Sequence, residues 1–334
     1  FGTAIKENPV VSDVIEEREV AFGRRSRRKT TKPVEDVGLG RSGPLTTSAA
    51  SHLHVAVAEG HAASVRVLLA QPDVDLKETD DQGNTVLHLA LDKGDEAMAL
   101  MLLKHGADIT SSNANGRQPL HYAALQGLEK ALQSLILAGA DVDSADDQGV
   151  TPLHAASDRG HTSVMALLID NGSSMETATV EGVTPLHLAA RSGHVNAVKL
   201  LLGLGCPVNC TTSHGLQPLH IATQEGHTTI AEILLKEGAY VNCHTRRNIT
   251  PLHIAAKENK KEVTALLIRH KADTNAQTNN GITPLHLAII ENADGVAQTL
   301  FAAGADPYIK DCDGETAFSM ASRRQRQNIF RRMR

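Results

Sequence analysis

The stretch Gly182-Val183-Thr184-Pro185-Leu186-His187-Leu188-Ala189-Ala190 decides the fold, because the chain repeats it at a nearly constant interval. The histidine of each copy marks the phase: the first interval is 34 residues, and each of the next six is 33. These phase histidines are His54, His88, His121, His154, His187, His220, His253 and His286. Ser319 takes the same position in a ninth, degenerate copy. Such a period is typical of a solenoid of stacked units rather than of one globular core.

One unit of the repeat encodes two short helices. Thr184 is a good helix N-cap and Pro185 suits the first helical position, where no amide partner is lost. Gly193 can end this helix, and a second apolar stripe over 195–202 follows before Gly205. The residues up to the next Pro-Leu-His phrase form an extended excursion. Two short helices cannot bury their apolar faces alone, so neighbouring units must stack.

Composition agrees with a core of closely spaced helices. Tryptophan is absent and aromatic residues make up only 2% of the 334 residues, so small and aliphatic side chains must fill the core. No apolar run approaches the ~18 residues of a membrane span, which predicts no direct membrane insertion. The four cysteines lack the spacing of a disulfide framework. We therefore expect a reducing compartment, the cytoplasm or the nucleus.

Three sequence features together resemble ankyrin repeats over about residues 49–334. They are the Gly-x-Thr-Pro-Leu-His-x-Ala-Ala phrase, the mid-repeat Gly-His pair and the Leu-Leu-x-x-Gly-Ala-Asp-Val-Asn ending. The resemblance implies an all-α repeat solenoid of about nine stacked units, each with two antiparallel helices and a projecting β-hairpin finger. It implies a curved slab that binds other proteins through a concave side lined by the first helices and the fingers, and that has no catalysis of its own.

The repeat phase predicts the domain boundaries. A flexible basic segment over 1–48 precedes the repeat array over 49–334. The repeats are expected near 49–82, 83–115, 116–148, 149–181, 182–214, 215–247, 248–280 and 281–313, with a cap over 314–334.

Charge is distributed unevenly along the array. Residues 51–181 hold seven basic and nineteen acidic residues, whereas residues 182–321 hold eleven and twelve. A negative field steers basic partners and repels nucleic acid, so we expect a basic or mixed protein or peptide partner and no nucleic acid. An ordinary solubilising acidic surface is the alternative. The sequence leaves the oligomeric state open.

Candidate partner contacts lie at two places in each unit. The position four residues after the phase histidine should face the concave side, and it holds Asp92, Leu125, Asp158, Arg191, Gln224, Lys257 and Ile290. Its two apolar members, Leu125 and Ile290, are either groove contacts or lone exposed aliphatics. The expected fingertips carry charged pairs, namely Asp80 with Asp81, Asp146 with Asp147, and Arg246 with Arg247.

The histidines and cysteines do not predict an enzyme or a metal site. Eight of the seventeen histidines are phase residues, and in the ankyrin family this imidazole ties the helix start to neighbouring loops. The ligand-like cluster is Cys206, Cys210, His214, Cys243 and His244. Cys210 and Cys243 lie one period apart, about 10 Å at helix stacking distance, too far for a disulfide or a shared zinc ion. We expect no catalytic residue, no metal and no cofactor.

Two function classes and one regulatory hypothesis follow. The chain is a protein-interaction scaffold, or it is the regulatory or targeting portion of a larger enzyme, ubiquitin ligase, kinase or channel. The basic segment Arg24–Lys32 is a nuclear signal, a self-mask on the acidic repeats or a plain linker. The arginine-rich context makes Ser26 and Thr30 candidate phosphorylation sites, and added phosphate would weaken the contact of this segment with the acidic repeats.

Overall fold

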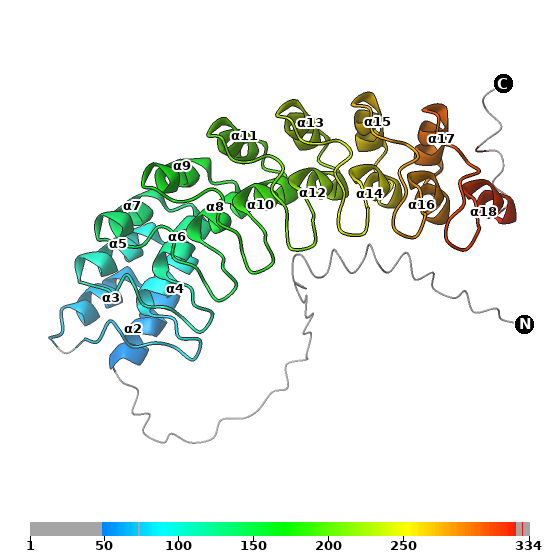
Figure 1. The fold of residues 1–334 in the computed structure, drawn as a ribbon. Coiled ribbons are helices and arrows are strands. Elements are labelled where there is room, and N and C mark those ends of the chain that lie inside the picture. The colour runs from blue at the N-terminus through cyan, green and yellow to red at the C-terminus, as the bar shows by residue number, and fades with distance from the viewer. Residues whose placement is uncertain (1–48, 73, 325–328, 330–334) are drawn as a thin grey trace, which may run out of the picture.

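The computed structural model describes residues 49–72, 74–324 and 329. The predicted basic segment, with Ser26 and Thr30, lies outside this part. The described residues form seventeen α-helices arranged as a curved double row, with a finger projecting from each junction between units (Figure 1). The ankyrin-like solenoid predicted from the repeat phase is therefore confirmed.

The inner row consists of the first helix of each unit. These are α2 (Ala49–Ala58), α4 (Val86–Asp92), α6 (Pro119–Gln126), α8 (Pro152–Arg159), α10 (Pro185–Ser192), α12 (Pro218–Glu225), α14 (Pro251–Lys257), α16 (Pro284–Ile290) and α18 (Ala317–Arg323). The outer row consists of α3 (Ala62–Leu69), α5 (Glu96–Lys104), α7 (Glu129–Leu137), α9 (Thr162–Asp170), α11 (Val195–Gly203), α13 (Thr228–Lys236), α15 (Lys261–Arg269) and α17 (Asp294–Ala302). Consecutive inner helices pack against each other, as do consecutive outer helices from α5 to α17.

The inner helices begin and end where the sequence predicts. Thr184 is the extended N-cap of α10, Pro185 is its first residue, and Gly193 ends it with a φ of 82°. A left-handed residue at a helix end is easiest for glycine, which has no Cβ. At the equivalent position after α14, Asn259 takes a φ of 52°. Asparagine tolerates this region better than most residues, so the helix pair turns in the same way.

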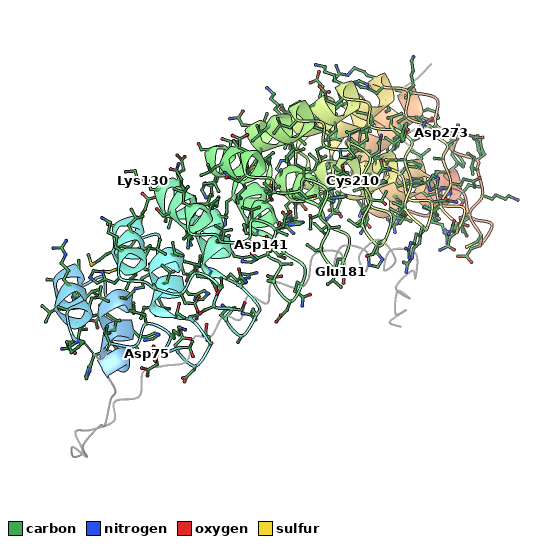
Figure 2. The ribbon with its side chains drawn as sticks, turned by 60° about the vertical axis from the view of Figure 1, so that its left-hand side comes forward. Asp75, Lys130, Asp141, Glu181, Cys210 and Asp273 are labelled. Atoms are coloured by element: carbon green, nitrogen blue, oxygen red, sulfur yellow. The ribbon has the colours of Figure 1, made fainter. Side chains whose placement is uncertain are left out.

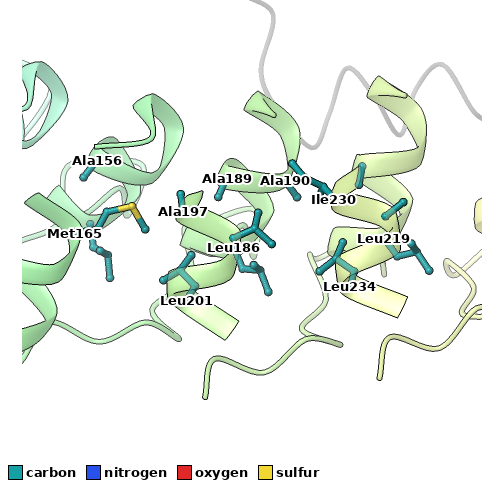
Figure 3. Packing of buried hydrophobic residues seen from close by; sticks show 14 of the residues in the cluster. Ala156, Met165, Leu186, Ala189, Ala190, Ala197, Leu201, Leu219, Ile230 and Leu234 are labelled. Carbon is teal, nitrogen blue, oxygen red and sulfur yellow. The ribbon is translucent and has the colours of Figure 1, made fainter. Parts of the chain in front are cut away.

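The core runs continuously through the array between the two rows. Around α10, Leu186, Ala189 and Ala190 of the inner helix and Ala197 and Leu201 of the outer helix are fully buried in one cluster (Figure 3). Alanine at these positions allows the helix axes to approach closely, and leucine fills the remaining space. A fully buried leucine contributes about 1.5–3 kcal/mol, so each interface between units contributes substantially to stability.

The fingers are tight turns rather than extended hairpins. The amide of Gly149 donates to the Asp146 carbonyl (2.8 Å), and the Asp146 amide donates to the Val150 carbonyl (3.0 Å). Within the described ranges, strand-like pairing occurs only as single bridges, between Thr79 and Thr85 and between Lys310 and Thr316. The expected β-hairpin is thus present as a turn with minimal ladder.

Candidate partner interface

The phase histidines tie each unit to the next. The Thr184 amide donates to Nδ1 of His187 (3.2 Å), so the ring proton is on Nε2, which donates to the Leu216 carbonyl (3.1 Å). His154, His220 and His253 make the equivalent pair of bonds. Burial lowers the pKa of each of these four histidines to about 4. They are neutral structural groups, as the repeat spacing predicted.

A second set of side chains ties each unit to the preceding one. Nε2 of His194, in the mid-repeat slot, lies 3.0 Å from the Asp158 carbonyl at the end of α8. His161 and His227 make the same contact with the carbonyls of Leu125 and Arg191. In the next unit Lys260 stands in this slot, and its ammonium group donates to the Glu225 carbonyl. A Cβ built on Gly160 would lie 2.5 Å from the ring of His194 in the next unit. The position at the end of the inner helix therefore has no room for a side chain, which explains the glycine there. These contacts hold the C-terminal ends of the inner helices.

The fingertips are joined into one edge by backbone hydrogen bonds. The Ser213 amide donates to the Glu181 carbonyl (2.9 Å), and the same bond links each described tip to the next from Gln82 to Cys312. Figure 2 shows Glu181 at the free end of its finger, on the opposite side of the array from Lys130 of the outer row. The tips therefore present their side chains from a fixed backbone.

The seven predicted concave positions differ in their surroundings. Asp92 is exposed, and Leu125 and Gln224 are half-buried. Asp158 and Arg191 pair with each other at 2.7 Å, and the Lys257 side chain is only 8% exposed, 3.8 Å from Glu258. Ile290 packs against the core. Asp92 and Leu125, at the acidic end of the array, are the members best placed for a partner.

The predicted fingertip residues separate into structural and exposed groups. Asp146 differs from the prediction of a partner contact at the fingertip, because its side chain is only 2% exposed. Its carboxylate lies 3.0 Å from Nε of Arg117. Asp80 accepts the amides of Gln82 and Asn84, as a turn cap does. Their neighbours Asp81 and Asp147 are exposed, and at the later tip Arg246 is exposed and Arg247 half-buried.

The position directly after the phase histidine was missed by the sequence analysis. In α4, α6 and α8 it holds Leu89, Tyr122 and Ala155, all half-buried. In α10, α12, α14 and α16 it holds aliphatic side chains that are at most 9% exposed, namely Leu188, Ile221, Ile254 and Leu287. The first three inner helices after α2 thus present apolar surface that the later ones bury.

For α4 and α6, the residue after the fingertip glycine, or its asparagine substitute, distinguishes these units from the later ones, whereas the finger before α8 carries Val150 and the inner helix itself supplies only the small Ala155. In the later fingers it is aliphatic, and Leu216, Ile249 and Ile254 form a buried cluster between finger and inner helix. In the fingers before α4 and α6 it is Asn84 and Arg117. The side-chain amide of Asn113 donates from Nδ2 to Oδ1 of Asn84 (2.8 Å) and to the Tyr122 hydroxyl (2.9 Å). The polarity of this one position is the sequence signal that would have found the surface.

The cysteine and histidine cluster is dispersed. Cys210 and Cys243 lie in successive fingers, each 3.7 Å from Nδ1 of its own phase histidine. Burial raises the pKa of the Cys206 and Cys243 thiols to about 12, so neither is a ready nucleophile. Over residues 49–72, 74–324 and 329, no three His, Cys, Asp or Glu side chains converge as metal ligands.

None of the helices in the described part is both long and apolar enough to cross a membrane.

Comparisons with known proteins agree with the repeat geometry. A family model described as ankyrin repeats (3 copies) matches residues 41–113, 108–178, 175–245 and 219–311. No curated protein sequence matches the chain. The crystal structure of the human ASB11 ankyrin repeat domain is similar, with a TM-score of 0.60 and 30% identity, over 65% of this chain and 99% of that one.

Proposed function

Because the chain belongs to the ankyrin repeat family, whose repeats are generally protein-protein interaction modules, we propose that it is a non-catalytic scaffold for a basic or mixed-charge protein segment. The segment binds what we call the N-terminal concave face. This face consists of the inner-helix side chains Leu89, Asp92, Tyr122, Leu125 and Ala155, and of the fingertip carboxylates Asp81 and Asp147.

One observation carries the proposal: the position after the phase histidine is half-buried in α4, α6 and α8 and buried in α10 to α16. Apolar area that a partner can remove from water supports affinity, at about 25 cal/mol per Å² before the costs of association. In the later repeats that area is already buried, and around α14 the finger residues Leu216 and Ile249 cover Ile254.

Charge supports the same location. The nineteen acidic and seven basic residues of 51–181 surround these helices, and Asp81, Asp92 and Asp147 are exposed there. Complementary charge increases the rate of encounter and excludes partners of the same sign. A basic segment with apolar anchors matches both properties of the face.

The second candidate is an ankyrin portion of a larger enzyme, ubiquitin ligase, kinase or channel. The similar solved structure is itself described as an ankyrin repeat domain, that is, as a part of a protein. The mass and domain content of the full-length protein would distinguish the two. Residence in the cytoplasm or nucleus belongs to the proposal, and it rests on the absence of a disulfide framework in the cysteine spacing.

Affinity capture with face variants and matched controls tests the proposed surface. Leu125→Glu and Asp147→Lys change the N-terminal concave face. Val67→Glu, at a side chain that is 67% exposed on outer helix α3, and Asp313→Lys, at the last fingertip, make the same substitutions elsewhere. We expect Leu125→Glu and Asp147→Lys to lose partners that the two control variants retain. The loss caused by Asp147→Lys should be larger at low salt, because salt screens the charge interaction. Equal capture by all four variants would overturn the proposal.

A further inference from the structure

One side chain from each fingertip belongs to a row along the finger edge of the array, which we call the fingertip row. From the second tip onward, the residue two positions before the fingertip glycine, or its asparagine substitute, donates its backbone amide to a carbonyl of the preceding tip. The Asp147 amide donates to the Asn115 carbonyl (3.1 Å), and the Arg246 amide donates to the His214 carbonyl (3.3 Å). Because this bond recurs at the same position of each turn, the row has a fixed register. Its members, from the first tip to the last, are Asp81, Ala114, Asp147, Val180, Ser213, Arg246, Asn279 and Cys312.

The charged members of the fingertip row change sign along the array. Asp81 and Asp147 place carboxylates in the first and third tips, and Arg246 places a guanidinium in the sixth. All three residues are exposed, and none of them forms an ion pair with another residue of the described ranges. Each charge can therefore pair with a partner without the loss of a salt bridge inside the array.

The two tips between these charges engage each other. The carboxylate of Glu181 in the fourth tip lies 3.7 Å from Nε2 of His214 in the fifth, and it accepts the Ser213 hydroxyl (3.3 Å). The row members at these two tips are Val180 and Ser213, which carry no charge. The fourth and fifth tips thus separate an acidic part of the row from its basic member.

The spacing of the charges sets the length of the segment that the row can hold. Stacked helices lie about 8–10 Å apart, so the two units from Asp81 to Asp147 correspond to about 20 Å and the three units from Asp147 to Arg246 to about 30 Å. An extended chain rises about 3.3 Å per residue, and these distances correspond to about six and about nine residues. A helix rises only about 1.5 Å per residue and would have to be a straight rod of about 30 residues, whereas the finger edge is curved (Figure 1).

We propose that the fingertip row binds an extended protein segment that is basic at one end and acidic at the other. The basic residues pair with Asp81 and Asp147, and the acidic residue pairs with Arg246. The charges thereby fix which end of the segment lies at which end of the array, because a reversed segment would meet like charges. The inference rests on the proposed function, and it gives the partner of that function an acidic end and an orientation.

Photocrosslinking of the full chain with a designed peptide tests this orientation. The probe is an acetylated peptide amide of glycine and serine with an arginine at its start, a second arginine about six residues later and a glutamate about nine residues further on. Two versions carry a benzophenone amino acid, one beside the first arginine and one beside the glutamate. A third peptide, with citrulline and glutamine in place of the charged residues, is the neutral control. Labelling is done at about 0.01 M salt, where the Debye length is about 30 Å.

We expect the acidic-end label to mark the sixth tip and the basic-end label to mark the first and third tips, with neither pattern for the neutral peptide. Arg246→Glu should reduce acidic-end labelling of the sixth tip roughly threefold, and a probe with lysine in place of glutamate should restore it. Arg269→Glu makes the same charge change at an exposed residue of outer helix α15 and should leave the labelling unchanged. Acidic-end labelling spread evenly over the tips, or equal losses in the two variants, would overturn the inference.

The labelling also separates this inference from the proposed function. If the acidic end does not select the sixth tip while Leu125→Glu and Asp147→Lys still lose the captured partners, the proposed function stands and the orientation is wrong. If the basic end also ignores the first and third tips and all four capture variants behave alike, the N-terminal concave face is wrong as well.

Discussion

The repeats before and after α10 share one backbone and differ in what fills the angle between finger and inner helix. Around α4 and α6, the side-chain amide of Asn113 donates to both Asn84 and the Tyr122 hydroxyl. Around α12 and α14, Leu216, Ile249 and Ile254 form a closed apolar cluster. The same contacts of the phase histidines therefore support a polar, partly exposed surface between finger and inner helix in the early repeats and a buried apolar one in the later repeats.

The energetic consequences of the two fillings differ. Burial of an aliphatic side chain contributes about 1.5–3 kcal/mol, whereas an exchanged hydrogen bond contributes only about 0.5–1.5 kcal/mol net. Because each unit contacts only its neighbours, these local differences persist along the array. We therefore expect the early repeats to be less stable but to expose more apolar surface, and the later repeats to be more stable.

The largest expected effect is loss of stability in acid. Burial lowers the pKa of His154, His187, His220 and His253 to about 4, against an ordinary 6.5. Below pH 6.5 the unfolded chain takes up protons that the folded chain refuses, so this stability is complete above pH 6.5 and is lost as the pH falls towards 4.

At pH 5 the loss is about 2 kcal/mol per histidine, on the order of 8 kcal/mol for the four. Urea unfolding at pH 7 and pH 5 measures this loss, and hydrogen exchange at pH 5 should show faster exchange in the inner helices α8, α10, α12 and α14, which carry the four histidines. A free energy of unfolding that is the same at both values would rule out neutral buried phase histidines.

The second effect compares one position in the two regions. Ile254 is 3% exposed within the apolar cluster, whereas Leu89, one residue after its own phase histidine, is half-buried. Ile254→Ala should cost about 2–5 kcal/mol, and Leu89→Ala about 1 kcal/mol, because only the former leaves a closed cavity. Chemical denaturation of both variants measures the difference, and equal costs would remove the distinction between sealed and open repeats.

The smallest effect is a gain in stability. The Ser157 hydroxyl in α8 is buried with no hydrogen-bond partner among the described side chains and backbone. The equivalent position in α10 is Ala190, so Ser157→Ala should raise the free energy of unfolding by about 1 kcal/mol. Ser192→Ala is the matched control, because that hydroxyl donates to Asp158 (2.8 Å) and its loss should destabilise. A destabilised Ser157→Ala would mean that the hydroxyl is satisfied.

The repeat frame could be predicted from the sequence because its determinants are local. Thr184 caps, Pro185 begins the helix and Gly193 ends it, all within one turn of the residues they act on. The role of His187 also followed, since the carbonyl that accepts from the phase histidine lies 29 residues later in every unit from His88 to His286.

The candidate surface was predicted only in part because it depends on contacts between units. Asp146 is a charged fingertip residue by sequence, but its carboxylate is buried, accepting the amides of its own turn and pairing with Arg117 from the preceding finger. Arg191 and Asp158 likewise neutralise each other across 33 residues. The exposure of Leu89 and Tyr122 depends on the side chain after the fingertip glycine in the neighbouring finger. The apolar period of a single helix contains no information about that side chain.

Hydrogen exchange of the full chain with a basic peptide tests the central claim most directly. The probe is a peptide of alternating arginine and leucine, at a salt concentration near 0.15 M where surface charge is partly screened. The account predicts added protection over α4, α6 and α8 and at the tips of Asp81 and Asp147, with α12, α14 and α16 unchanged. Protection confined to α12–α16, or spread equally along the inner row, would contradict it.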